Sequence, residues 1–535
     1  PAIGIDLGTT FSAVSYVNRG EVVVIHNNAG HEITPSVVHF DESIVLVGEE
    51  AVKKRKDGAM NTIFNIKRLI GRKHDDIVVQ QRKWPFEILR GSNERISVRV
   101  DAEIYSPEQI SAFILNYIKR IAKKVLFEDP VDAVITVPAN FTNAQREATR
   151  DAGRMTGFNV LQIVNEPTAA AIAFCDEKKQ KSREPCIFPL FRRVLVFDLG
   201  GGTFDVSIVE MEGKRTKVLA TDGLTTLGGT DFDDRIYEEA LARFQEMGIK
   251  ITGLDWTLME ACENAKKALA KRNSARISHP HYGGAGFDLT YSTFVELCED
   301  LFEQTLTLTE KVLSEACIDE DLINEIMLVG GSTRIRRVRE MLKERFDNTL
   351  IRDDIEPELA VAKGAALLVS NKIDPSLQAD SLSRLSPPSD SSSSVPFPVT
   401  SLIDVTPLPL GMTLDGDRCK ILIPKNTRCP FTTYQYYTNV LDDEKKLMIE
   451  ILEGDNSQAS ANNTLAKVEI DILPKPKGKN LIKVLLSIDV NGILNVHAID
   501  EDTNKEVSVT IKNEKLDDFE IVKMTQELNS IRQGG

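Results

Sequence analysis

The stretch "DLGGGTFD" at residues 198–205 directly follows the apolar run "RVLVF" at 193–197. Its three consecutive glycines carry no Cβ atoms, so backbone N–H groups in this stretch can approach a bulky anion closely. For a single glycine run, the structural alternative is a tight hairpin or a bulge. A phosphate becomes the favoured ligand only if other parts of the chain supply matching groups.

Two other segments repeat this arrangement. The segment "AIGIDLGTTFSAV" at 2–14 has an apolar strand, an aspartate and then a glycine with small hydroxylated residues, so Asp6 corresponds to Asp198. A third turn, in "IMLVGGSTRI" at 326–335, also follows an apolar run. None of the three contains the P-loop or the dinucleotide-binding glycine pattern. We therefore predict that two facing hairpins hold the phosphates.

Length and charge limit the classes of protein that the chain can belong to. A chain of 535 residues is too long for one hydrophobic core and favours three to four structural units. With a net charge of −15, a broad surface for nucleic acid or an anionic membrane is not expected, because both need a positive footprint. We therefore expect neither nucleic acid nor a membrane among the partners.

The cysteines indicate a reducing, cytoplasmic environment. The seven cysteines include no C-x-x-C pair and have no histidine cluster nearby, which argues against a disulfide framework or a metal site. No apolar run reaches about 18 residues, and the first residues are strand-like, so neither a membrane span nor a signal peptide is predicted. The chain does not begin with Met, which leaves a removed presequence open.

The pattern of apolar residues changes along the chain. Residues 1–375 alternate strands with amphipathic helices, which predicts an α/β domain. Residues 376–404 are rich in serine and proline and are predicted to be an interdomain linker. Residues 405–512 switch to short strands, typical of a β-sandwich, and 513–535 form a short polar tail.

Two local signals support these predictions. Ser106, Pro107 and Gln109 read as the N-cap, first turn and capping box of a helix over 106–126, whose apolar face is core. An Asn-Gly pair at 491–492 separates two alternating runs and is a strong hairpin signal. The inward face of the first run is expected to carry Ile482, Val484, Leu486 and Ile488.

Seven motifs in order give the chain a resemblance to a known family. They are "GIDLGTT", "NTIFNIKRLIGRK", "NEPTAAAIAF", "DLGGGTFD", "LVGGSTRI", "DVTPLPLG" and "DVNGILNV". From residue 2 to about 512, the chain resembles the heat-shock-seventy chaperones. This resemblance implies an actin-like (ribonuclease-H-like) α/β ATPase domain of two lobes, followed by an all-β sandwich that binds extended peptides.

The resemblance also implies roles for residues around the glycine turns. Lys67 matches the lysine that positions the attacking water, and its alternative is a solvated surface lysine. The implied catalytic set is Lys67, Glu166, Asp198 and Thr203. The implied Mg²⁺ ligands, acting largely through water, are Asp6, Asp198 and Asp205. The implied nucleotide-binding residues are Gly8, Thr9, Thr10, Phe11, Gly201, Gly202, Thr203, Glu263, Lys266, Lys267, Ala270, Gly331, Ser332 and Arg334. ATP or ADP and Mg²⁺ are the implied cofactors, with K⁺ as a further candidate.

Some positions depart from the family pattern. Lys267 stands where an arginine usually stacks on the adenine, and Ala270 replaces a serine. A lysine has no planar face, so we expect weaker nucleotide binding, unless this segment is only a charged helix face. The interdomain relay is represented by Pro138 and Arg146. Further departures near the expected coupling surfaces are Asn140, Thr230, Arg336 and Lys363, and the linker motif is reduced to "VTSLID" at 399–404.

The second domain is expected to carry the peptide groove. The residues that match its lining are Met412, Tyr437, Leu447 and Ile449, and plain core packing is their alternative. Asp415 and Val440 match the arch over the peptide. The chain stops at 535, where family members continue into a helical lid, so we expect either a natural lidless form or a truncated one.

Three functions are compared on this basis. The first is an ATP-dependent chaperone that binds exposed hydrophobic segments, with a J-domain co-chaperone and a nucleotide-exchange factor as partners implied by the resemblance. The second is a lidless nucleotide-binding regulator with little or no ATPase activity, favoured by the altered linker. The third, a small-molecule kinase on an actin-like fold, leaves the β-sandwich without a role.

Overall fold

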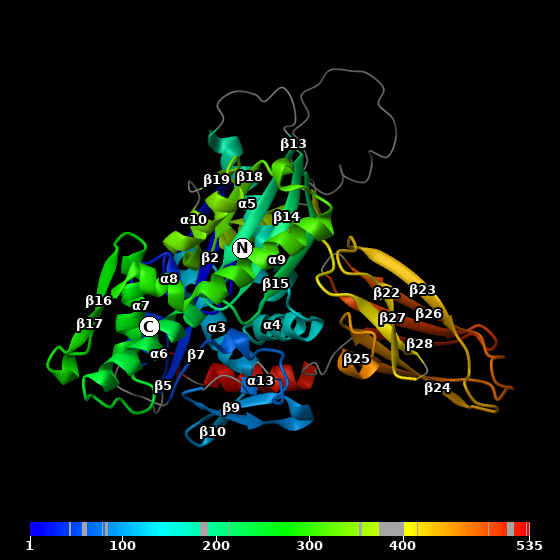
Figure 1. The fold of residues 1–535 in the computed structure, drawn as a ribbon. Coiled ribbons are helices and arrows are strands. Elements are labelled where there is room, and N and C mark those ends of the chain that lie inside the picture. Colours follow the sequence, from blue (N-terminus) through cyan, green and yellow to red (C-terminus); the bar gives the residue numbers. More distant parts are fainter. Residues whose placement is uncertain are drawn as a thin grey trace. The chain divides into compact units, whose positions relative to one another are not determined.

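The structure is a computed structural model of the 535-residue chain, and it divides into two compact units. The first unit comprises Pro1–Ala139, Thr149–Ser401 and Asp518–Gly535, and the second comprises Asn140–Ala148 and Leu402–Asp517. The residues that the structure describes are 1–41, 44–55, 61–76, 79–80, 84–181, 191–212, 215–352, 356–373, 401–414, 416–489, 492–510, 518–530 and 532–533. Figure 1 shows the course of the chain.

Two sheets of the first unit share one strand order, β12-β11-β1-β2-β3 in one and β19-β18-β13-β14-β15 in the other. In each, the middle strand is parallel to one neighbour and antiparallel to the other. The strands of the first sheet are β1 (Ala2–Asp6), β2 (Phe11–Asn18), β3 (Glu21–Val24), β4 (Ile33–Pro35), β11 (Asp132–Val137) and β12 (Asn159–Asn165). Those of the second are β13 (Phe191–Leu199), β14 (Phe204–Glu212), β15 (Arg215–Leu224), β18 (Glu325–Val329) and β19 (Leu350–Arg352).

Shorter strands and the helices complete the first unit. The shorter strands are β5 (Val37–Asp41), β6 (Ile44–Val47), β7 (Thr62–Phe64), β8 (Glu87–Arg90), β9 (Ile96–Val100), β10 (Glu103–Tyr105), β16 (Ser274–Ser278), β17 (Gly286–Thr290) and β29 (Arg532–Gln533). The α-helices of the first unit are α1 (Glu49–Arg55), α3 (Pro107–Leu126), α5 (Glu166–Lys181), α6 (Gly229–Glu246), α7 (Trp256–Leu269), α8 (Tyr291–Leu297), α9 (Glu299–Ala316), α10 (Arg336–Arg345), α11 (Ala360–Ile373) and α13 (Asp518–Ser530). Helix α4 (Asn143–Met155) begins in the segment Asn140–Ala148 of the second unit and ends in the first. The 3₁₀ helices are η1 (Ile66–Arg68), η2 (Ser92–Glu94), η3 (Pro280–Tyr282), η4 (Glu320–Leu322) and η5 (Gly331–Arg334).

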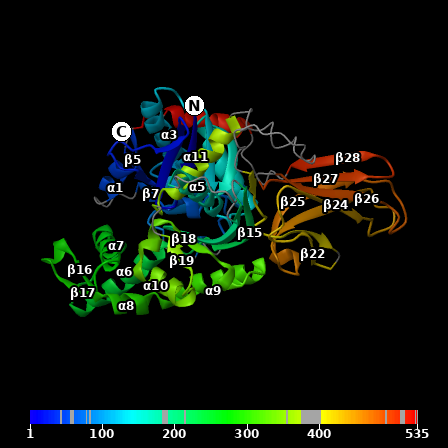
Figure 2. The same cartoon turned by 90° about the horizontal axis from the view of Figure 1, so that it is seen from above.

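Helices α5 and α11 pack against each other and against the two sheets, as Figure 2 shows. Helix α11 lies on β1, β2 and β11, while α5 also contacts β13 and β14. Two glycines permit this close packing. A Cβ on Gly4 would lie 2.0 Å from the backbone N of Ala366, and one on Gly364 would lie 1.7 Å from the backbone O of Ala169. The absence of Cβ atoms therefore brings strand β1, α11 and α5 into backbone contact.

The second unit contains two four-stranded antiparallel sheets, ordered β22-β21-β24-β25 and β23-β26-β27-β28. Inward-facing residues of both sheets form one hydrophobic core, which makes the unit a β-sandwich. The strands of these two sheets are β21 (Leu410–Leu414), β22 (Arg418–Ile423), β23 (Phe431–Tyr437), β24 (Lys446–Glu453), β25 (Asn463–Asp471), β26 (Ile482–Ile488), β27 (Leu494–Asp500) and β28 (Lys505–Thr510), with η7 at Ala459–Ala461. Strand β20 (Ser401–Ile403) falls at the boundary between the two units and belongs to neither sheet of the sandwich.

The two local sequence signals are confirmed. In α3, the Ser106 side chain accepts a hydrogen bond from the N–H of Gln109, whose side chain accepts one from the N–H of Ser106. Strands β26 and β27 form the predicted hairpin, with Ile488 opposite Leu494 and the expected inward face buried. Residue 491 of the Asn-Gly turn, and the linker over 376–400, lie outside the described residues.

The described part of the C-terminal tail belongs to the first unit. Helix α13 lies beside α3 (Figure 1). Between them, Gln109 Nε2 donates a hydrogen bond to Glu527 Oε2 at 3.2 Å. Strand β29 then pairs in parallel with β6. Among the described residues, no helix combines the length and apolar character that crossing a membrane requires.

We expect Gly364→Ala to destabilise the first unit by about 2 kcal/mol or more, because the added methyl group would overlap the backbone of α5. Thermal unfolding followed by circular dichroism measures this change. An unchanged unfolding midpoint would show that α5 and α11 can separate without cost.

Candidate functional site

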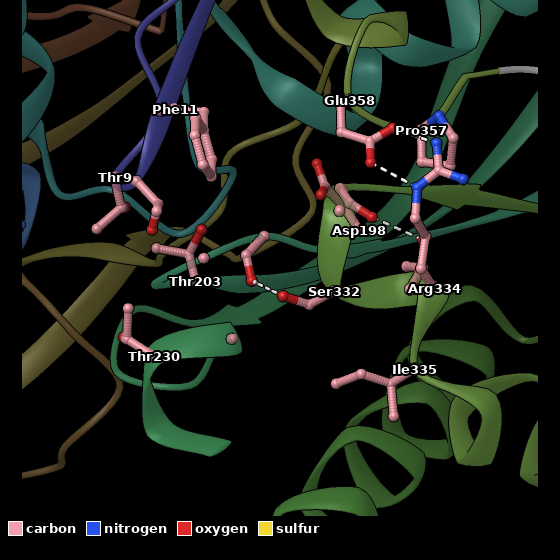
Figure 3. A pocket seen from close by; sticks show the side chains of 18 of the residues that line it. Thr9, Phe11, Asp198, Thr203, Thr230, Ser332, Arg334, Ile335, Pro357 and Glu358 are labelled. Atoms are coloured by element: carbon pink, nitrogen blue, oxygen red, sulfur yellow. Dashed lines mark hydrogen bonds and ion pairs between the residues drawn. The ribbon is translucent and has the colours of Figure 1, made fainter. Parts of the chain in front are cut away.

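The three glycine turns meet at a cavity of about 860 Å³ in the first unit. The turn after β1 and the turn after β13 each connect antiparallel strands, and the third turn leads from β18 into η5. Figure 3 shows Thr9 and Thr203 on one side of this cavity and Arg334 and Glu358 on the other. The repeated strand and turn in the sequence thus produces a single site.

The first two turns face each other at very short range. A Cβ on Gly201 would lie 1.9 Å from Thr10 Oγ1, and one on Gly202 would lie 2.5 Å from Thr9 Cγ2. A Cβ on Gly8 would lie 1.9 Å from a backbone oxygen of its own turn. Only glycine fits at these positions, so the glycines are required by the approach of the hairpins as well as by access to the backbone N–H groups. The prediction that the two hairpins face each other is confirmed.

A buried ion pair lies in the wall beside these turns. Lys67 of η1 donates a hydrogen bond to Glu166, the first residue of α5, with 2.5 Å between Nζ and Oε1. The two side chains are 5% and 9% exposed, and both line the cavity. Lys67 is therefore not a solvated surface lysine. Burial of such a pair costs desolvation free energy, so its position in a cavity wall indicates a function there.

Three aspartates lie at or one residue from the ends of the central strands, next to this pair. Asp6 is the last residue of β1, and Asp198 in β13 lies opposite Asp205 in β14. Thr136 donates a hydrogen bond to Asp6 at 3.3 Å, while Asp198 Oδ2 is buried without a hydrogen-bond partner. Strand register therefore concentrates carboxylates where the two sheets end at the cavity.

Burial of these carboxylates changes their acidity. Desolvation, reinforced by the charge of Glu166, raises the pKa of Asp6 from 3.8 to about 7. Desolvation and the neighbouring Glu166, Asp205 and Asp6 raise the pKa of Asp198 well above its ordinary value. Lys67 opposes both shifts. The cluster is thus short of positive charge, and a cation bound there would stabilise the ionised forms.

The third turn is held by contacts to the other elements. Ser332 donates a hydrogen bond to the backbone O of Gly200 at 2.8 Å. Arg334 donates two hydrogen bonds to Glu358, from Nε at 2.6 Å and from Nη2 at 2.7 Å (Figure 3). This bidentate pairing fixes the plane of the guanidinium group at the cavity wall.

Helices α6 and α7 supply another wall. Lys266 Nζ donates hydrogen bonds to Asp233 Oδ2 and to the backbone O of Gly229, both at 2.8 Å. Desolvation raises the pKa of Asp233 to about 6 despite this contact. Lys267 instead pairs with Glu263 at 2.7 Å, and its side chain is 59% exposed. The two adjacent lysines thus differ, because one is fixed in the wall and the other lies largely in solvent.

Arg68, next to Lys67, connects η1 to helix α6. It donates two hydrogen bonds to Asp231, from Nη1 at 3.0 Å and from Nη2 at 2.5 Å, and a third to Thr230 at 3.0 Å. Asp231 also accepts a hydrogen bond from the N–H of Gly228, so it caps α6 at the same time. The segment that carries Lys67 is therefore held against the start of α6.

The cavity brings together most of the residues that the sequence analysis assigned to the nucleotide and the metal. Those that line it are Asp6, Gly8, Thr9, Thr10, Phe11, Lys67, Glu166, Asp198, Gly201, Thr203, Glu263, Lys266, Lys267, Ala270, Gly331, Ser332 and Arg334. Gly202 and Asp205 are outside this lining, although Gly202 packs on Thr9 and Asp205 is buried opposite Asp198. The roles of all the residues assigned to the nucleotide and the metal stay predictions.

The residues expected to line a peptide groove lie in the core of the sandwich. Met412, Leu447 and Ile449 are buried in the core shared by the two sheets, and Tyr437 packs against it. The Tyr437 hydroxyl lies 3.2 Å from Met412 Sδ. The structure therefore places all four where the core-packing alternative expected them, and a role in peptide binding stays a prediction. Asp415 lies outside the described residues.

The two relay residues lie on the segment that follows β11. Pro138 is buried immediately after this strand, and Arg146 of α4 donates a hydrogen bond from Nε to the backbone O of Phe141 at 3.1 Å. A role in coupling stays a prediction.

Several residues of the site were missed because their partners are distant in the sequence. Glu358, which fixes Arg334, is 24 residues away from it and shows no local motif. Asp233 could have been noticed as an acid in the first turns of a helix that follows a Gly-Gly pair. Thr230 and Arg336, which we assigned to domain coupling, both line the cavity.

Comparison with known proteins identifies the family. The family model described as Hsp70 protein matches residues 2–534. Heat shock cognate 70 kDa protein 3 of Dictyostelium discoideum is 38% identical over 550 residues, covering 99% of this chain and 84% of that protein. Heat shock 70 kDa protein of Neurospora crassa is 38% identical, covering 100% of this chain and 81% of that protein. A ribosome-associated molecular chaperone of Saccharomyces cerevisiae is 36% identical, covering 99% of this chain and 85% of that protein.

These matches define the class as that of the molecular chaperones that bind ATP or ADP. The chain belongs to the Hsp70 family, and its function is that of an ATP-dependent chaperone.

We expect Gly201→Ala to weaken ADP binding at least about 10-fold, because the new methyl group would collide with Thr10 and separate the two hairpins. Titration calorimetry measures the affinity. Gly200→Ala is the matched control, since its Cβ would meet its nearest atom only at 3.6 Å and should perturb binding far less. Equal losses in the two variants would contradict this steric explanation.

We expect Asp6→Asn to stabilise the nucleotide-free protein more at pH 8 than at pH 5. With a folded-state pKa of about 7 and an ordinary value of 3.8, folded Asp6 keeps a proton that the unfolded chain has lost, so stability falls as the pH rises through this window. Asparagine cannot ionise and removes this cost. Thermal unfolding at both pH values tests the expectation, and a gain that does not depend on pH would contradict it.

Proposed function

We propose that the chain is a Mg²⁺-dependent ATPase whose nucleotide state controls binding of exposed hydrophobic peptide segments. The observation that carries this proposal is the pair of glycine hairpins that face each other beside the buried Lys67–Glu166 pair. Backbone N–H groups on two sides of a cavity suit a polyphosphate, since phosphoryl transfer depends mainly on positioning and charge stabilisation. Family membership supports the same assignment.

The rest of the nucleotide fits the far side of the cavity. Lys266 and Glu263 of α7 present a cation and a carboxylate that suit ribose hydroxyl groups. Arg334, held flat by Glu358, offers a planar guanidinium face to an aromatic base. The proposed ligand is ATP or ADP, with phosphates at the hairpins and adenine toward Arg334.

The carboxylate cluster fits a hydrated magnesium ion. The described residues contain no group of three or more His, Cys, Asp or Glu side chains placed to ligate a bare metal ion, so the contacts would run largely through water. The buried Asp198 Oδ2 without a hydrogen-bond partner is suited to accept a hydrogen bond from such a water. Asp6, Asp198 and Asp205 would hold the ion, which would neutralise charge on the phosphates when bound.

Lys67 is the proposed catalytic residue of this chain. Its ammonium group lies in the cavity wall, paired with Glu166. We infer that it positions a water molecule near the terminal phosphate of bound ATP, while the ion pair prevents the flexible lysine from turning away. Thr203, on the facing hairpin, is placed to contact the same region of the ligand.

The sandwich is the proposed peptide-binding domain, in the boundaries 405–512 that the sequence predicts. An extended peptide would bond to strand edges and place an apolar side chain near Met412, Tyr437, Leu447 and Ile449. These residues are buried in the structure, and the Tyr437 hydroxyl contacts the Met412 sulfur. Binding of a peptide side chain among them would therefore require these residues to move apart. A J-domain co-chaperone and a nucleotide-exchange factor are proposed partners.

Single-turnover hydrolysis of ATP with Mg²⁺, with and without an unfolded apolar peptide, tests this function. We expect slow hydrolysis that the peptide accelerates. We also expect Lys67→Ala to reduce hydrolysis by at least about 100-fold while ADP binding changes little, because the lysine acts on water rather than on the phosphate cradle.

The outcomes separate the candidate functions. Hydrolysis that peptide does not change would show an ATPase without coupling to the sandwich. Bound ATP without hydrolysis in the wild-type chain would favour the nucleotide-binding regulator. Unchanged turnover in Lys67→Ala would remove this lysine from the mechanism, and turnover that depends on a sugar would favour a kinase.

A further inference from the structure

Arg336, the first residue of α10, lines the cavity in a position that helix stability does not explain. A positive charge in the first turn opposes the helix dipole, and α10 has no acidic residue in this turn and no side-chain cap. Arg337 follows directly, but it does not line the cavity and pairs with Glu344. Arg336 is therefore the residue of this turn whose placement requires another explanation.

The Arg336 guanidinium group stacks on an aromatic ring. Its central carbon lies 3.4 Å from the centroid of the Tyr291 ring, at the start of α8. This distance is that of a face-to-face contact and combines cation–π attraction with stacking of two flat groups. Because one face of the guanidinium group covers Tyr291, the opposite face is the one that can meet a ligand.

Three further contacts hold this stack in place. Arg336 Nη1 donates a hydrogen bond to Asn273 Oδ1 at 2.9 Å, and its Nε lies 3.2 Å from Glu340 Oε1. The Tyr291 hydroxyl donates a hydrogen bond to the other oxygen of Glu340 at 2.5 Å. Both members of the stack are therefore tied to one carboxylate, and the guanidinium plane is fixed before any ligand arrives.

The nearby Lys267 cannot replace this planar group. Its ammonium group has no flat face, and it is drawn to Glu263 with its side chain mostly in solvent. A flat, preformed cationic surface in a cavity suits an aromatic ring system, and the polyphosphate cradle on the other side of the same cavity identifies that ring as a nucleobase.

We propose that Arg336, supported by Tyr291, is a stacking platform for the adenine base and provides the planar face that Lys267 lacks. This proposal rests on the proposed nucleotide binding. It makes Arg336 a specificity-determining residue that acts on the base and has no direct contact with the phosphates.

Two measurements test the platform. Titration calorimetry with ADP gives the affinity of the wild-type protein and of Arg336→Ala, Arg336→Lys and Arg337→Ala. Acrylamide quenching of bound ADP that carries the fluorescent base ethenoadenine reports how well the base is covered. Arg337→Ala is the matched control, since it removes a neighbouring charge that does not line the cavity.

We expect Arg336→Ala and Arg336→Lys to weaken ADP binding by similar factors of about 3- to 10-fold and to make the bound base more accessible to the quencher. Arg337→Ala should change neither quantity appreciably. Wild-type affinity and protection in Arg336→Lys would overturn stacking in favour of charge alone. Equal behaviour of Arg336→Ala and Arg337→Ala would overturn any contact with the base.

Failure of the proposed function gives a different result. If the wild-type protein does not bind ADP, the nucleotide site itself is wrong. If it binds ADP and the Arg336 variants retain full affinity and protection, the platform alone is wrong. Tyr291→Phe adds a check on folding, because it keeps the ring and removes only the hydroxyl that holds Glu340.

Discussion

The close approach of two hairpin turns is the constraint on which the rest of the first unit depends. Gly201 and Gly202 meet Thr10 and Thr9 at distances that exclude any Cβ atom. Each turn is the end of the central pair of strands in its own sheet, so bringing the turns together also fixes the two sheets relative to the cavity. The side of the cavity formed by these two turns is thus shaped by backbone packing.

The electrostatics of the site follow from this packing. Strand ends that converge on a narrow space bring Asp6 and Asp198 together beside Glu166, away from water, and ionisation of the two aspartates becomes unfavourable. Lys67 compensates only in part. A cation bound there would offset the charge of the carboxylates and favour their ionised forms. A ligand that brings positive charge to this site would therefore stabilise the folded protein.

Local features of the fold could be predicted from the sequence, whereas contacts between distant residues could not. The strand and glycine turns at Asp6 and Asp198 and the capping box at Ser106 depend on neighbours a few residues apart, and all are present. The bidentate pairing of Arg334 with Glu358 and the stacking of Arg336 on Tyr291 join separate elements, so no periodicity indicates them. The same limit applies to Met412, since alternation shows that a strand residue points inward and cannot show whether it meets a ligand or the core.

The packing of α11 on the first sheet has a consequence for biosynthesis. Strands β1, β11 and β12 are complete once residue 165 has been made, yet the face of β1 that holds Gly4 is covered by a helix ending at Ile373. At about 5–20 residues per second, a ribosome needs roughly 10–40 seconds to make the intervening segment. During that time the Gly4 face of the nascent sheet lacks the helix that covers it in the folded chain. The first sheet is thus incompletely packed for part of the chain's own synthesis.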